Sequence, residues 1–418
     1  MININKLSNG VTVITEEIDY VNSVAFGVWI KCGAVNETPD VSGVSHFIEH
    51  MMFKGTKTRS AKQIAEDMDK IGAQFNAFTG KEATCYYMKS ISQNLEKGAD
   101  IILDMVNYSV FDAHEMARER NVIIEEMKMT NDQPDELAQD KIYELLYKDE
   151  PLGKSIIGTP TSVKGISRNA LLKYRNANYA LDNIVVSVSG NFETEKVLKY
   201  LEDKFVNFEK KSTGLKNDCT YDSDNNQFRS ITKEIQQSHI VLASKGLTKL
   251  DKGYYDLYIL SNIVGGGMSS RFFQNIREEK GLAYSVYAAS SSFSKTGMFE
   301  IYAGVAHENI RKAIMAIREE LEKAEAFGFS EDELSMAKEQ MKSSYIFGQE
   351  NILSRMFANG RNYVQIGKVI TADEVIDGIE AVSLNSIKEV MPLITDRSRY
   401  SGVIVSRTRA GIREMWNK

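Results

Sequence analysis

Two histidines and a glutamate in the stretch VSHFIEHMMFKG have the types and spacing of a metal-binding group with a neighbouring base. His46 and His50 are four residues apart, and Glu49 directly precedes the second histidine. Side chains at i and i+4 lie one turn apart on one face of a helix, so both imidazoles could bind one zinc ion. Glu49 could then reach a water molecule beside the metal.

The same stretch also fits an amphipathic helix whose two histidines bind no metal. On a helical wheel the apolar side chains cover one side, and the two histidines and Glu49 cluster on the other. Catalytic zinc needs a third protein ligand and an open fourth position. A third ligand elsewhere in the chain would therefore favour the metal site.

Candidates for this third ligand lie in the helical segment RERNVIIEEMKMTNDQPDE. Glu126 follows Glu119 by two turns on nearly the same face, beside Val122, whereas Glu125 points to the polar side. A carboxylate on an apolar face is costly unless it is paired, protonated or bound to metal. Glu126 is the predicted ligand, with an ion-paired or capped carboxylate as the alternative. Glu119 is expected to hydrogen-bond a ligand or to replace Glu126.

With these residues the chain resembles the M16 metallopeptidases, the family of pitrilysin, insulysin and the mitochondrial processing peptidases. The matching elements are HFIEH at 46–50, an EEM segment whose Glu126 follows His50 by 76 positions, and Glu119 seven residues before it. The resemblance spans essentially the whole chain, at the length of the short members with one duplication. It implies one zinc ion per chain, held by the two histidines and Glu126, with Glu49 as general base.

The resemblance also implies roles away from the motif. Arg277 and Tyr284 match a family arginine and tyrosine that reach the substrate near zinc and can donate hydrogen bonds to an oxyanion. The segment IGAQFNAFT resembles an edge strand to which an extended substrate adds by main-chain hydrogen bonds. It carries Asn76, which matches a position close to the scissile bond, Ala77, and Phe78, which could line a side-chain pocket. Without the resemblance, the simpler interpretation is that Arg277 is a surface residue and that Tyr284 and Asn76 are ordinary strand residues.

Size and composition limit the other classes of function. A chain of 418 residues usually forms two domains, and a net charge of −6 with scattered basic residues argues against nucleic acid as a partner. No run reaches the roughly 18 apolar residues of a membrane span, and the first twenty residues do not read as a signal peptide. Three scattered cysteines form no disulfide framework. We expect a cytoplasmic protein that does not associate with membranes.

Strand and helix patterns recur in a similar order in the two halves, on either side of a polar segment at 207–228. This predicts an α+β fold of two homologous domains, each a mostly antiparallel sheet packed with helices, joined by a linker into a clamshell. The predicted domains are 1–206, which binds zinc, and 229–418, which supplies substrate and transition-state contacts. The candidate residues are expected on helices over 44–53, 114–129 and 270–280 and on a strand over 74–79.

The sequence therefore predicts a zinc-dependent endopeptidase that cleaves peptides or unfolded precursor segments. The alternative is a non-catalytic partner or scaffold subunit of an M16-type complex, a class that loses a histidine or glutamate of the site. We expect a homodimer or a pair with a related M16-type subunit. The ligand set alone would also admit manganese or cobalt.

Overall fold

The computed structural model describes residues 2–205, 208–221 and 226–417. The chain forms two compact units, each of which contains pieces of both halves of the sequence. The first unit comprises residues 1–127, 154–218 and 347–371, and the second comprises 128–153, 219–346 and 372–418.

The first unit is built on a six-stranded sheet with the order β1-β2-β6-β3-β5-β4. Strands β2 and β6 are parallel, and the other neighbouring pairs are antiparallel. Its strands are β1 (Ile2–Lys6), β2 (Thr12–Glu17), β3 (Ser23–Ile30), β4 (Gln74–Thr79), β5 (Thr84–Ile91) and β6 (Ile184–Gly190). Its helices are α1 (Val44–Met52), α2 (Ala61–Lys70), α3 (Leu95–Tyr108), α4 (Ala113–Asp132, whose last turn belongs to the second unit), α6 (Pro160–Gly165), α7 (Arg168–Asn178), α8 (Thr194–Leu201) and α12 (Ile352–Ile366).

The second unit is built on a five-stranded sheet with the order β7-β11-β8-β10-β9, in which β7 and β11 are parallel. Its strands are β7 (Phe228–Thr232), β8 (Ser238–Gly246), β9 (Ala283–Ser292), β10 (Gly297–Val305) and β11 (Ser401–Ser406). Its helices are α5 (Pro134–Leu146), α9 (Tyr254–Gly265), a π-helix (Phe273–Glu279), α10 (Ile310–Phe327), α11 (Glu331–Gln349), α13 (Ala372–Glu380), α14 (Leu384–Val390), α15 (Pro392–Thr395) and α16 (Ile412–Asn417).

The two sheets share one topology. When strands are matched in chain order, β2-β6-β3-β5-β4 of the first sheet corresponds to β7-β11-β8-β10-β9 of the second. Each sheet has one parallel pair at the same place and is otherwise antiparallel. The predicted fold, a duplicated α+β unit with mostly antiparallel sheets, is confirmed.

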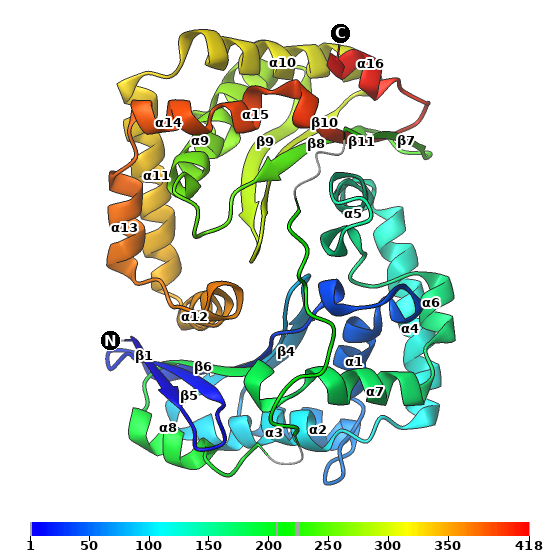
Figure 1. The fold of residues 1–418 in the computed structure, drawn as a ribbon, viewed down its shortest axis with the longest axis vertical. Coiled ribbons are helices and arrows are strands. Elements are labelled where there is room, and N and C mark those ends of the chain that lie inside the picture. The colour runs from blue at the N-terminus through cyan, green and yellow to red at the C-terminus, as the bar shows by residue number, and fades with distance from the viewer. Residues whose placement is uncertain (1, 206–207, 222–225, 418) are drawn as a thin grey trace. The chain divides into compact units, whose positions relative to one another are not determined.

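One helix of each unit comes from the other half of the sequence. Helix α5 packs on β8 and β11 of the second sheet, and α12 packs on β3 and β6 of the first sheet (Figure 1). Strand side chains alternate between two faces, so a sheet whose second face is apolar needs a cover on that side too. On the first sheet, α12 supplies it, because Met356 is buried there with Ile14, Trp29 and Val185.

The polar segment at 207–228 was predicted to be a linker, and residues 207 and 222–225 of it lie outside the described residues. Residues 208–218 are bound to the first unit, whereas 219–221 and 226–228 belong to the second. The Thr213 N–H donates to Ala177 O at 2.9 Å, and the Asn36 side chain donates to Leu215 O at 2.7 Å. The predicted boundaries at 1–206 and 229–418 stay a prediction.

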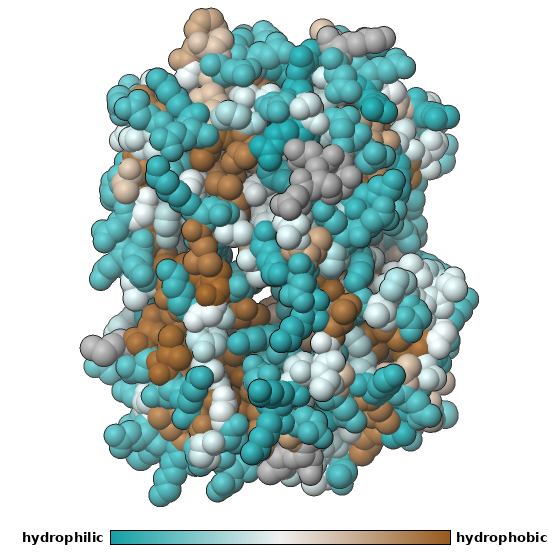
Figure 2. Space-filling view, viewed as in Figure 1, coloured by the Kyte–Doolittle hydropathy of each residue, from teal (hydrophilic) through white to brown (hydrophobic). Residues whose placement is uncertain are grey.

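The surface is mostly polar on the face drawn in Figure 2, where apolar side chains gather in smaller patches. Among the described residues, no helix combines the length and the apolar character needed to cross a bilayer.

Candidate metal centre

Helix α1 presents its histidines because its opposite side is built for the core. Phe47, Ile48 and Met51 are fully buried and belong to the hydrophobic core of the first unit. Packing of these side chains fixes the rotation of the helix, so the side that carries His46 and His50 has a defined direction.

The first turn of α1 is held by a carboxylate from outside the helix. The helix follows Gly43 at φ 89°, where a Cβ would come within 2.6 Å of Ile157 O. Since a glycine cannot cap with its own side chain, Glu37 does so, and its carboxylate accepts from Gly43 N at 2.7 Å and Ser45 N at 2.8 Å. Glu37 is fully buried, and this burial raises its pKa to about 7 although both hydrogen bonds oppose the shift.

The structure brings the three predicted ligands together. Atoms of His46, His50 and Glu126 that can bind a metal all lie within 4.8 Å of one another. The Glu126 carboxylate lies 3.7 Å from His46 Nε2 and 3.4 Å from His50 Nε2. Glu126 is less buried than its sequence position suggested, with 41% of its side chain exposed. Val122, expected on the apolar face beside it, is also exposed.

Glu119 is the buried carboxylate of α4, and it contacts His50 at Nδ1, the ring nitrogen that does not face Glu126. Its Oε2 lies 3.1 Å from His50 Nδ1, and its Oε1 lies 2.7 Å from Lys54 Nζ. An ionised carboxylate only accepts hydrogen bonds, so His50 Nδ1 must carry the proton. In the neutral form that a metal ligand requires, the lone pair of His50 is then on Nε2, the nitrogen that faces Glu126.

The charges around the three residues favour deprotonated ligands at two positions. Burial, together with the neighbouring His50, lowers the pKa of His46 to about 4, so its imidazole is neutral at pH 7. Contact with His50 lowers the pKa of Glu126. For His50, burial acts in the other direction, but the carboxylates of Glu126 and Glu119 outweigh it and raise the pKa.

This arrangement fits a zinc ion. Zinc–nitrogen and zinc–oxygen bonds of about 2.1 Å in a tetrahedron place neighbouring ligand atoms roughly 3.4 Å apart. Glu126 Oε1 lies 3.7 Å from His46 Nε2 and Glu126 Oε2 lies 3.4 Å from His50 Nε2, so each carboxylate oxygen is near that spacing from one imidazole. Two nitrogens and one carboxylate form the donor set of many catalytic zinc sites, which leave the fourth position open.

Glu49 lies on α1 next to His50 and is half-buried. The Thr79 hydroxyl of β4 donates to Glu49 Oε2 at 2.5 Å. Burial raises the pKa of Glu49, and the hydrogen bond from Thr79 opposes this. A carboxylate fixed in this way can exchange a proton with a neighbouring water.

The predicted substrate strand is β4, the edge strand of the first sheet, which pairs with β5 on one side. Asn76 is exposed, Ala77 is buried, and Phe78 is half-buried. The Phe78 ring lies 5.5 Å from the Trp29 ring and 5.6 Å from the Phe357 ring of α12, so it is one wall of an aromatic cluster. An edge strand can accept a peptide as an additional strand.

Arg277 and Tyr284 belong to the second unit and are neighbours there. Arg277 lies on the π-helix where an ordinary helix over 270–280 was predicted. Its guanidinium lies 4.7 Å from the Phe273 ring centroid and 5.7 Å from the Tyr284 ring centroid. Tyr284 is 73% exposed at the start of β9. Both side chains are therefore available for hydrogen bonding, and their catalytic role stays a prediction.

Comparison with known proteins shows to which protein family this chain is related. The family profile described as insulinase (peptidase family M16) matches residues 12–160, and the profile of the M16 inactive domain matches residues 165–341. A Bacillus subtilis protein named as an uncharacterized zinc protease is 40% identical over 381 residues, which cover 91% of this chain and 92% of that protein. The chain belongs to the insulinase (M16) peptidase family. The resemblance inferred from the sequence is confirmed.

A further relative and two solved structures match over almost the full length. A Rickettsia bellii protein with the same kind of name is 36% identical over 410 residues, 98% of each chain. The crystal structure of a protease from Helicobacter pylori matches with a TM-score of 0.87 and 20% identity, over 97% of this chain and 99% of that one. A structure of a putative M16-like peptidase from Alicyclobacillus acidocaldarius matches with a TM-score of 0.84, 18% identity and coverage of 97% and 98%. These two structures support the fold.

The second unit of this M16 chain lacks the motif of the first. In chain order α9 follows β8 as α1 follows β3, and it packs on β9 as α1 packs on β4. Its sequence, YYDLYILSNIVG, contains no histidine. This agrees with the description of the matching profile as an inactive domain.

Three residues that act on the site were missed from the sequence. Glu37 caps α1, Thr79 binds Glu49, and Lys54 binds Glu119. The contacts of Thr79 and Lys54 join elements that are distant in the chain, and Glu37 caps from an irregular segment six residues before Gly43, so helical or strand periodicity gives no sign of any of them. A glycine before the motif was the one available hint, because a helix that starts at glycine needs an external cap.

Proposed function

We propose that this chain is a zinc-dependent endopeptidase that cleaves peptides or unfolded precursor segments. The observation that carries the proposal is the convergence of His46, His50 and Glu126, with Glu119 behind His50. Membership of the M16 family and relatives named as zinc proteases support it.

Bound zinc would polarise the scissile carbonyl and lower the pKa of a water molecule. Glu49 would act as general base and take a proton from the attacking water as the water oxygen bonds to the carbonyl carbon. Glu49 then delivers the proton to the amide nitrogen as the C–N bond breaks, so that one water is consumed for each peptide bond. The family resemblance supports a further role for Arg277 and Tyr284, as hydrogen-bond donors to the substrate oxygen on which negative charge develops.

The substrate is bound in extended form. Strand β4 offers main-chain groups along its outer edge, and Asn76 and Phe78 point away from the face that Thr79 shares with Glu49. A peptide aligned with β4 would place alternate side chains on the two faces of the sheet. Such binding selects unfolded segments, because a folded substrate has no free strand to offer.

A non-catalytic scaffold subunit is the alternative function. It has less support, because the chain keeps both histidines, the third ligand and Glu49. We further propose that the enzyme works in the cytoplasm as a homodimer or beside a related M16-type subunit. The family resemblance supports the pairing, and the low cysteine content supports the location.

The decisive comparison is between the wild type and Glu49→Gln. Both should contain zinc by mass spectrometry, and the variant should cleave a mixed peptide library at least about 100-fold more slowly, since a general base contributes that much or more. Glu125→Gln, an exposed acid on α4, is the matched control and should cleave like the wild type. Full activity of Glu49→Gln would contradict the mechanism. Zinc binding without cleavage by the wild type would favour the scaffold alternative.

A further inference from the structure

Glu119 is a buried carboxylate whose two oxygens have different partners. Its side chain is 7% exposed, with Oε2 on His50 Nδ1 and Oε1 on Lys54 Nζ. A carboxylate removed from water needs partners for its charge, and a single imidazole N–H supplies one hydrogen bond. Lys54 is the cation that completes the set.

The backbone places Lys54 directly after the metal-binding helix. The Lys54 N–H donates to Met51 O at 3.1 Å, so the lysine still belongs to the C-terminal turn of α1. A positive charge is favourable at this end of a helix, where the carbonyl groups point outward. His50 and Lys54 are four residues apart, so they lie on one face and both reach Glu119 of α4.

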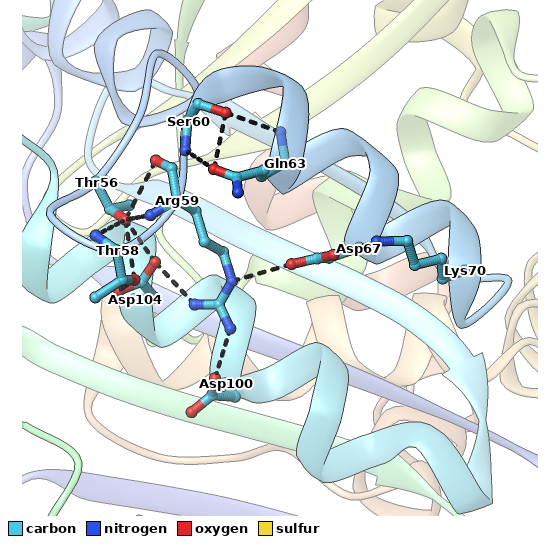
Figure 3. Close-up of polar contacts among 9 residues, drawn as sticks. All are labelled: Thr56, Thr58, Arg59, Ser60, Gln63, Asp67, Lys70, Asp100 and Asp104. Carbon is cyan, nitrogen blue, oxygen red and sulfur yellow. Dashed lines mark hydrogen bonds and ion pairs between the residues drawn. The ribbon is translucent and has the colours of Figure 1, made fainter.

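The loop after Lys54 is fastened to α3. Figure 3 shows Thr56, Thr58 and Arg59 gathered around Asp104, which is almost fully buried. The two hydroxyls donate to Asp104 at 2.7 and 2.8 Å, and Arg59 lies 2.9 Å both from Asp104 and from Asp100. A buried carboxylate that receives three donors fixes the path of this loop.

The same loop is fastened to the chain that enters α4. The Val110 N–H donates to Gly55 O at 3.2 Å, and the Lys57 N–H donates to Tyr108 O at 3.0 Å. The loop that begins at Lys54 is thus tied to the start of the helix that carries Glu119. The distance from Lys54 to Glu119 is set by backbone contacts and does not depend on a long side chain alone.

We propose that Lys54 is a positioning residue for the metal centre. By holding Oε1 of Glu119 it turns Oε2 toward His50, which keeps the proton on Nδ1 and the metal-binding lone pair on Nε2. This inference rests on the proposed zinc site. A partner that orients a histidine ligand changes metal affinity although it never touches the metal.

The test measures zinc affinity of metal-free protein by competition with a chromophoric chelator. Lys54→Met should weaken zinc binding by roughly tenfold, the lower end of the range for such supporting residues. Lys54→Arg keeps the charge and should recover most of the affinity. Lys57→Met is the matched control, because Lys57 lies in the same loop, is exposed and has its Nζ 5.8 Å from the Tyr108 ring. It should bind zinc like the wild type.

A double-mutant cycle separates positioning from a general loss of stability. If Lys54 acts through Glu119, Lys54→Met should weaken zinc binding no further in a protein that already carries Glu119→Gln. Equal additional loss in both backgrounds would overturn the inference, as would unchanged affinity of Lys54→Met. Lys54→Gln takes the place of Lys54→Met if that variant does not fold. A wild type that binds no zinc contradicts the proposed function and the inference together, whereas failure of the cycle alone contradicts only the inference.

Discussion

Glu119 and Glu126 stand seven residues apart on α4, and from the sequence they share one face. The structure separates them, because Glu119 is buried against His50 and Lys54 and Glu126 is 41% exposed beside the two imidazoles. A ligand that leaves room for substrate must border open space, whereas a residue that orients a ligand can be buried. The partly exposed carboxylate is therefore the better ligand and the buried one the better support.

Substitution of Glu119 and substitution of Glu126 should lower the zinc affinity of the protein by different amounts. Glu119→Gln should weaken zinc binding by about 10–100-fold, because it disturbs only the orientation of His50. Glu126→Ala removes a ligand and should weaken binding more. Competition titrations of both variants against one chelator check the order. The reverse order would make Glu119 the ligand.

Thr79 gives a prediction at the same scale. Its hydroxyl is the donor that holds Glu49, so Thr79→Val should lower the rate of peptide cleavage and leave the zinc content unchanged. Since a hydrogen bond to a charged group contributes about 1.5–3 kcal/mol, roughly a tenfold to hundredfold slower kcat is expected. Steady-state kinetics on a single peptide give this value. Loss of zinc in Thr79→Val would place the threonine in the metal site instead.

At the scale of the element, α1 depends on Glu37 for its first turn. Burial raises the pKa of Glu37 to about 7, from a usual value of 4.5. Between these two pH values the folded protein holds a proton that the unfolded chain releases. The contribution of Glu37 to stability is therefore largest at low pH and falls as pH rises toward 7.

Comparison of the wild type with Glu37→Gln measures this pH-dependent contribution to stability. The variant side chain cannot ionise, so the melting temperature of the wild type minus that of the variant should fall as pH rises from 4.5 to above 7. Calorimetric scans across this range provide the measurement. A difference that grows with pH would mean that the ionised carboxylate is the stabilising form of the cap.

Helix α12 depends on an ion pair with a buried carboxylate, that of Glu16. Arg355 lies 2.7 Å from Glu16 of β2, and Asn359 donates to the same carboxylate at 2.8 Å. Arg355→Met leaves the carboxylate without its cation and should lower the free energy of unfolding by roughly 2–4 kcal/mol. Denaturant titration measures the change. The exposed Lys252, paired with Glu389, is the control, and Lys252→Met should leave stability unchanged.

At the scale of the whole molecule, the exchange of α5 and α12 between the halves is the dominant feature. Residues 1–218 alone lack α12, so the face around Ile14, Trp29 and Val185 would meet water. This fragment should bind a hydrophobic dye or aggregate when expressed alone. Co-expression with residues 219–418 should give a complex that purifies together. A separate, well-folded 1–218 fragment would contradict this view of the units.

The sequence predicted those parts of the protein that depend on local pattern. The motif helix, the edge strand and the helix of Glu126 follow from periodicity and turn residues near each site. The exchange of α12 was not predicted, because its amphipathic pattern shows that one face is buried without showing against which sheet. Lys54 was missed for a related reason, since packing of a distant segment brings its partner Glu119 near. Glu37 is close to α1 in the chain, but it lies in an irregular segment whose pattern does not show where its side chain points.

The central claim is that zinc held by His46, His50 and Glu126 acts on a peptide aligned with β4. The most direct measurement is diffraction at the zinc absorption edge from crystals of zinc-loaded Glu49→Gln with a peptide that the wild type cleaves. We predict one anomalous peak among the three side chains, and a peptide strand paired with β4 whose scissile carbonyl lies beside that peak. A peak elsewhere, or a peptide bound away from β4, would contradict the account.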